Sequence, residues 1–130
     1  MRLTVEKNGL CLVFELEKGK PVLLLHMGVN TEFEEPTEGK EFLYTMQEIQ
    51  GTGESRLEHL GIGPSGTFPG NRMYYVEHEE SENTYGSVLA IITKDDITGL
   101  KSRMVYQFYN DIPVVRCWNE VTNEGNRCRM

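Results

Sequence analysis

Length, composition and charge describe an ordinary globular chain. It has 130 residues, of which 38% are hydrophobic and 25% charged, as expected for one folded domain. The 13 Lys and Arg are outnumbered by 20 Asp and Glu, giving a net charge of −7, which argues against a general nucleic-acid binder because neutralising phosphates needs clustered cations. The apolar runs of the chain, residues 22–25 among them, are far too short to span a bilayer, so no membrane partner is expected.

The cysteines and the first residues bear on the cellular compartment. Cys11, Cys117 and Cys128 are odd in number and widely spaced, which suits neither a disulfide framework nor a metal site. Residues 1–6 alternate in polarity, whereas a secretory signal needs a continuous apolar segment. We therefore expect a cytoplasmic protein with no metal and no cofactor.

Apolar residues alternate with polar ones from the start of the chain, which is the pattern of β-strands. Residues 3–7 and 10–17 are predicted to pair as a hairpin, because Asn8-Gly9 between them is the dipeptide preferred in a type I′ turn. Residues 21–27 are apolar on both faces. This pattern favours either a central strand covered on two sides or one layer of a sandwich.

The middle of the chain breaks this pattern before it resumes. A strand predicted over residues 42–50 is followed by the Gly- and Pro-rich residues 51–71, a loop long enough to be either functional or disordered. Further strands are predicted over residues 72–79, 87–93, 100–109 and 114–122. No window of a dozen residues has a convincing helical period. The chain is therefore predicted to be all-β, a single antiparallel β-sandwich of seven to nine short strands over residues 1–130.

Two segments resemble a known family. One reads GTFPGNRMYYVEH at residues 66–78, preceded by QGTGE at 50–54, and the other reads YQFYNDIPVVRCWNEVTNEG at 106–125. Over about residues 40–125 the chain is similar to the first domain of bacterial α-galactosidases of glycoside hydrolase family 36. In that family the second segment forms two long strands joined by a tight turn.

The resemblance implies a larger enzyme of which this chain is one domain. Such enzymes combine an N-terminal β-supersandwich, a catalytic (β/α)8 barrel and a small C-terminal β-domain. The barrel's nucleophile is an Asp in a Lys-Trp-Asp-type motif, and no aspartate of this chain follows Lys-Trp. The expected function is that of the non-catalytic N-terminal domain of a retaining α-galactosidase. Whether the sandwich is complete in this chain stays open.

The carboxylates of the chain itself do not predict a catalytic pair. Retaining glycoside hydrolysis needs two carboxyl groups about 5–5.5 Å apart. Asp95 and Asp96 would point to opposite faces of a strand or be solvent-exposed on a turn, and Glu77 and Glu79 would share a face about 7 Å apart. No orienting partner is evident for the three histidines, His26, His59 and His78.

The long loop supplies the candidate site residues. The resemblance implies that this loop approaches the active site, in some members that of a neighbouring subunit. Sugars are bound by planar hydrogen-bonding side chains, so the candidates for a substrate rim are Arg56, Glu58 and His59. Family members are His-rich here, whereas this loop keeps one His. The implied partners are the barrel of the same polypeptide, further copies in a homo-oligomer, and a galactoside ligand.

Two alternatives to the scaffold interpretation remain. The first is a free-standing carbohydrate-binding module, for which Arg116 and Trp118 on one strand face are a candidate stacking pair, although a Trp on a sandwich strand is expected more often in the core. The second is a mutarotase-like epimerase, which also has a supersandwich fold. That enzyme needs a Glu base and His acids converging in a cleft, and it would be about twice as long as this chain.

Overall fold

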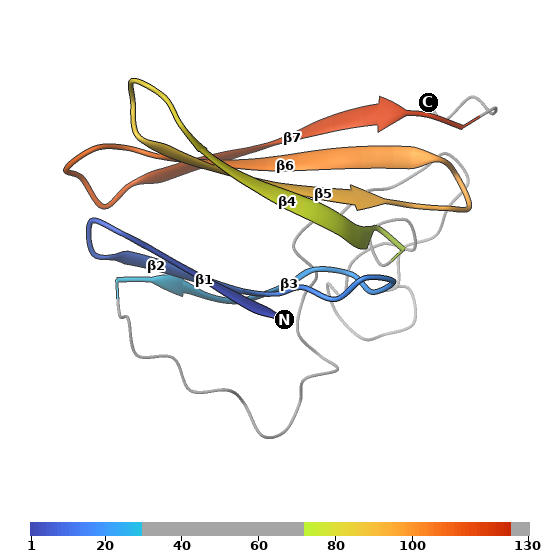
Figure 1. Cartoon of the computed structure of the whole chain (residues 1–130), viewed down its shortest axis with the longest axis horizontal. Coiled ribbons are helices and arrows are strands. Elements are labelled where there is room, and N and C mark those ends of the chain that lie inside the picture. The colour runs from blue at the N-terminus through green and yellow to red at the C-terminus, as the bar shows by residue number, and fades with distance from the viewer. Residues whose placement is uncertain (30–71, 126–130) are drawn as a thin grey trace, which may run out of the picture.

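The computed structural model describes residues 1–29 and 72–125, which form two stacked antiparallel β-sheets (Figure 1). The first sheet has the order β1-β2-β3, with β1 at Arg2–Lys7, β2 at Leu10–Glu15 and β3 at Leu23–Gly28. The second has the order β4-β5-β6-β7, with β4 at Tyr74–Glu82, β5 at Ser87–Lys94, β6 at Leu100–Phe108 and β7 at Val115–Asn123. The predicted all-β, antiparallel β-sandwich is confirmed. The strand predicted over residues 42–50 lies outside the described residues.

The hydrophobic core lies between the two sheets. Leu12 and Phe14 of β2 are fully buried and belong to the same cluster as Leu89 and Ile91 of β5. Phe14 also meets Tyr106 of β6 edge to face, with ring centroids 5.2 Å apart and an interplanar angle of 64°. Apolar side chains from both layers thus leave water together, which is the main stabilisation available to a two-layer sandwich.

The strand buried on both faces is β2, and not the apolar segment that follows it. Every residue from 10 to 14 is buried, so Cys11 and Val13 on one face are as inaccessible as Leu12 and Phe14 on the other. Among the described strands β3 lies at the edge of its sheet, and its Met27 is 57% exposed. The sandwich-layer interpretation of residues 21–27 is therefore confirmed. The central position, among the described strands of this sheet, belongs to β2.

The first hairpin turn has the predicted conformation and also joins the two sheets. Asn8 and Gly9 have φ values of 53° and 87°, the left-handed values that a type I′ turn requires at both positions. The Asn8 side-chain amide donates hydrogen bonds to the carbonyls of Tyr109 at 2.7 Å and Ile112 at 3.3 Å. The turn after β1 is thereby fastened to the turn after β6, and both lie at the left of Figure 1.

At another turn two glycines let the backbone approach itself closely. Gly99, between β5 and β6, has a φ of 78°, and a Cβ built on it would lie 2.5 Å from the backbone of Gly125. The Glu124 amide donates a hydrogen bond to the Gly99 carbonyl at 2.9 Å. The residues after β7 therefore pack directly on the β5–β6 turn.

The described residues contain no helix that is long and apolar enough to cross a membrane.

Candidate functional site

The predicted substrate-rim residues are not among those the structure describes. Arg56, Glu58 and His59 lie outside the described ranges, as does the whole predicted loop over residues 51–71. Their assignment to a substrate rim stays a prediction. The geometry that the structure describes lies within residues 1–29 and 72–125.

Asp95 is the most enclosed carboxylate in these ranges, with no exposed side-chain surface. Arg72 donates to both carboxylate oxygens, from Nε at 3.2 and 3.3 Å and from Nη2 at 3.1 Å. The Thr98 hydroxyl donates at 2.7 Å and the Ile97 amide at 3.0 Å. Donors from two parts of the chain thus converge on one carboxylate at the β5–β6 turn.

These hydrogen bonds decide the charge of Asp95. Burial acts to raise its pKa, but the bonds from Arg72, Thr98 and the Ile97 amide, together with the Arg72 charge, hold that pKa below its ordinary value. Asp95 is therefore ionised at neutral pH and its oxygens are engaged in shaping the turn. The expectation that turn aspartates are exposed is confirmed for Asp96 and wrong for Asp95.

A bulge in β4 gives His78 a partner that the sequence pattern did not indicate. The pairing of β4 with β5 shifts register between Tyr75 and Glu77, so residues three apart come to the same face. The Tyr75 hydroxyl lies 2.8 Å from His78 Nδ1. Burial raises the pKa of Tyr75, and the nearby Glu77 charge raises it further. Glu77 and Glu79, which pair with alternate residues of β5, share a face as predicted.

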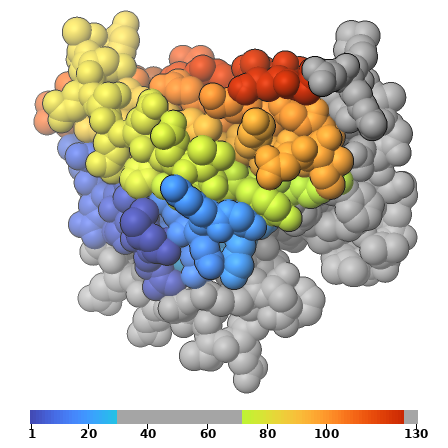
Figure 2. Space-filling model, turned by 45° about the vertical axis from the view of Figure 1, so that its right-hand side comes forward, coloured from blue at the N-terminus to red at the C-terminus, as the bar shows by residue number. Residues whose placement is uncertain are grey.

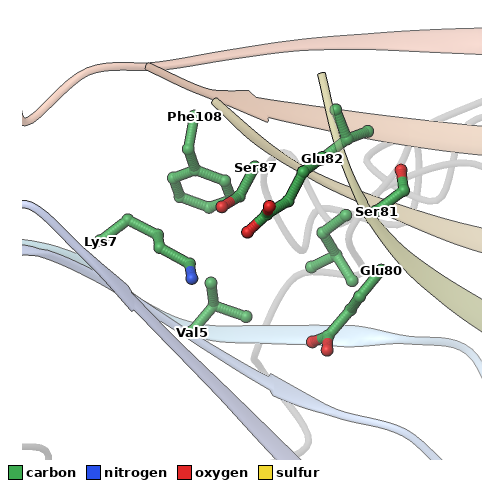
Figure 3. Close-up of a pocket in the computed structure, with 9 residues that line it drawn as sticks. Val5, Lys7, Glu80, Ser81, Glu82, Ser87 and Phe108 are labelled. Atoms are coloured by element: carbon green, nitrogen blue, oxygen red, sulfur yellow. The ribbon is translucent and has the colours of Figure 1, made fainter. Parts of the chain in front are cut away.

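A cleft of about 240 Å³ opens between the two sheets where β1 lies opposite β4 (Figure 3). Lys7 reaches into it from β1, and Glu82 points into it from β4. Its apolar lining includes Val5, Leu89 and Phe108. The volume lies below the roughly 300–1,000 Å³ of sites for drug-sized ligands. The cleft therefore combines charges of both signs with an apolar lining.

Sequence reasoning missed this cleft because its walls come from strands that are distant in the chain. One signal was present, however. In β4 the residues that share a face with His78 are Glu80 and Glu82, where a core-forming strand would carry apolar side chains. Acidic residues on both faces of a strand indicate an edge strand whose inner face lines a polar cleft rather than the hydrophobic core.

Trp118 lies on the surface, and the expectation that it belongs to the core is wrong. Its side chain is 38% exposed on the face of the second sheet that points away from the first. The Arg116 guanidinium carbon is 5.6 Å from the indole centroid, so the two residues stack as their spacing suggested. The indole Nε1 donates to Glu120 at 2.9 Å, and Arg103 forms an ion pair with Glu120 at 3.2 Å.

The described residues place the chain in the class of two-layer antiparallel β-sandwich proteins. Comparison with known proteins adds no narrower class, because no family model, curated protein or solved structure matches the chain.

Proposed function

We propose that the chain is the non-catalytic N-terminal domain of an α-galactosidase of glycoside hydrolase family 36, in which an adjoining barrel hydrolyses terminal α-galactosides. The observation that carries the proposal is the segment at residues 106–125, whose sequence resembles that family. It includes the end of β6, a short turn and all of β7, and β6 and β7 are nine-residue antiparallel partners. The two-sheet sandwich also agrees with the architecture that the resemblance implies.

Within such an enzyme the domain would act by contact rather than by chemistry. It would support the barrel, take part in oligomer assembly and bring residues 51–71 to the rim of the active site. Cys11 and Cys117 are both free thiols, which supports a cytoplasmic location because thiols stay reduced there.

Two observations test the proposal: the reading frame downstream of this sequence, and an α-galactosidase assay of the chain. The reading frame is expected to continue past Met130 into a barrel with a Lys-Trp-Asp motif. The 130-residue chain alone is expected to leave an aryl α-galactoside intact. A reading frame that stops without a barrel would overturn the proposal. So would hydrolysis of the aryl α-galactoside by the isolated chain, if a mock purification shows no such activity.

A free-standing carbohydrate-binding module is the second candidate, because Trp118 is exposed. An accessible indole with Arg116 and Glu120 beside it combines a flat apolar surface with planar hydrogen-bonding groups, which is what a sugar ring requires. Trp118 is the only tryptophan of the chain, so its fluorescence reports directly on this surface. Saturable quenching or shift with galactose, melibiose or raffinose at millimolar or lower concentration would favour this function, and an unchanged spectrum would count against it.

A further inference from the structure

β7 is an edge strand of the second sheet among the strands that the structure describes. Among the described strands it lies at the end of the second sheet, and all but the first of its nine residues are exposed. Its atoms, in red, lie at the upper edge of the molecule in Figure 2. An edge strand presents unpaired backbone N–H and C=O groups, so it can accept another strand unless its side chains prevent this.

The other edge of the same sheet is protected against self-pairing, whereas β7 is not. β4 has four acidic side chains in nine residues, Glu77, Glu79, Glu80 and Glu82. A second copy of that strand would bring like charges together, which is a common protection of sheet edges. β7 has one Arg and one Glu, no Lys, and exposed apolar side chains at Trp118 and Val121.

The sequence of β7 is also complementary to itself about Trp118. Arg116 and Glu120 stand two residues to either side, and Val115 and Val121 stand three residues to either side. We propose that β7 pairs antiparallel with β7 of a second copy of this chain, with the two-fold axis at Trp118. The two four-stranded sheets then form one continuous sheet across the dimer.

This register matches the side chains on both faces. In an antiparallel two-fold pair, each residue lies opposite the one equally far on the other side of the axis, so Arg116 lies opposite Glu120 of the second copy. That contact occurs twice, and each Glu120 gains a second cation beside Arg103. On the other face Val115 lies opposite Val121, which is 50% exposed in the single chain. Moving the axis by one residue destroys both matches.

The pairing does not depend on the proposed function, because it uses only β7. A sugar or an adjoining domain could occupy the same surface, and the tests below separate these occupants from a second copy.

The first experiment measures the mass of the full chain by sedimentation equilibrium. Wild type is expected to dimerise, and Arg116→Glu is expected to raise the dimer dissociation constant about tenfold or more, because the introduced carboxylate would face Glu120 of the second copy. The double variant R116E/E120R should recover dimerisation, since opposite charges face each other again. Lys18→Glu makes the same change in net charge at an exposed site of the chain away from β7 and should leave the dimer unchanged.

The second experiment tests the register by disulfide formation in a C117S/C128S background. In Trp118→Cys the two thiols face each other, with Cα atoms about 4.5–5.5 Å apart, which a disulfide can bridge. In Glu120→Cys the two positions are offset by four residues, roughly 13 Å along the strands, so no bridge forms. Cross-linking at 118 and not at 120 supports the proposal.

Several results would overturn the inference. They are a monomer at every concentration, a dimer indifferent to Arg116→Glu, equal cross-linking at positions 118 and 120, and no cross-linking at either position.

Discussion

At the scale of single residues, the Asp95 carboxylate is a buried charge whose partners can be removed one at a time. It is fully buried and accepts hydrogen bonds from Arg72, Thr98 and the Ile97 amide. Asp95→Asn keeps the shape but removes the charge that holds Arg72. We expect a loss of about 3 kcal/mol in the free energy of unfolding. This is the lower end of the range for breaking a buried ion pair, because the Arg72 side chain is partly exposed. Urea unfolding at neutral pH measures it.

The same group makes stability depend on pH in a defined direction. The pKa of Asp95 is lowered in the fold from its ordinary 3.8, so its contribution is complete above that value and is lost as pH falls toward the folded pKa. Wild type should therefore lose more stability than Asp95→Asn when the pH is lowered from neutral to about 3. Equal acid sensitivity of the two proteins would show that Asp95 is not held ionised by the fold.

Gly99 is required for two separable reasons, its backbone conformation and the space beside it. Its φ is 78°, and a Cβ would lie 2.5 Å from Gly125. Gly19 has nearly the same φ, 81°, but nothing within 4 Å of its Cβ position. Gly99→Ala should therefore cost more stability than Gly19→Ala, by about 1 kcal/mol or more, because only the first adds a backbone clash. Thermal unfolding of both variants gives the comparison, and equal losses would contradict it.

The residue scale is also where sequence reasoning was least reliable. Trp118 was expected in the core because large aromatic side chains on sandwich strands are usually buried, and it is exposed because β7 is an edge strand in the described part of the chain. Asp95 was expected to be exposed if it lay on a turn. It is buried instead, and the Arg72 side chain that binds it comes from 23 residues earlier in the chain. In both cases the environment of the residue is set by a contact that is distant in sequence.

At the scale of elements, the hairpin signals were the most dependable. The Asn8-Gly9 turn and all seven described strands were predicted to within a few residues, because turn chemistry and alternation are local properties. The position of a strand within its sheet was not predictable in the same way. The apolar residues 21–27 suggested either a central strand or one layer of a sandwich, and among the described strands β2 holds the central position. The β4 bulge, which brings Tyr75 to His78, likewise left no local signal.

The first turn also acts as a link between elements, which Asn8 allows us to test. Asn8→Gly keeps the left-handed conformation and removes only the side-chain bonds to Tyr109 and Ile112. We expect a loss of about 1 kcal/mol. Asn8→Ala should cost about 1 kcal/mol more, because it adds the strain of a positive φ. Both values come from chemical denaturation, and an Asn8→Gly variant as stable as wild type would show that the link contributes nothing.

At the scale of the whole molecule, the sandwich could be predicted and the arrangement of its surfaces could not. Period-two alternation and short turns determine that two sheets bury their apolar faces, whatever their order. The cleft needs Lys7 and Glu82 to face each other from different sheets, and this depends on which edges are stacked. The predicted rim, Arg56, Glu58 and His59, lies outside the described residues and stays a prediction.

Pairing of two chains through β7 would make the stability of the whole molecule depend on its concentration. Because only folded chains pair, association stabilises the folded state by mass action. Each tenfold rise in protein concentration then adds up to about 1.4 kcal/mol to the free energy of unfolding, per mole of dimer. The thermal midpoint of wild type should therefore rise by a few degrees over a hundredfold range of concentration. That of Arg116→Glu should begin to rise only at concentrations about tenfold higher or more, because its dimer is weaker by that factor, while Lys18→Glu should behave as wild type does. A midpoint independent of concentration in wild type would mean that the β7 edge is unoccupied by a second copy over that range, and that Trp118 is free to contact a sugar or another domain.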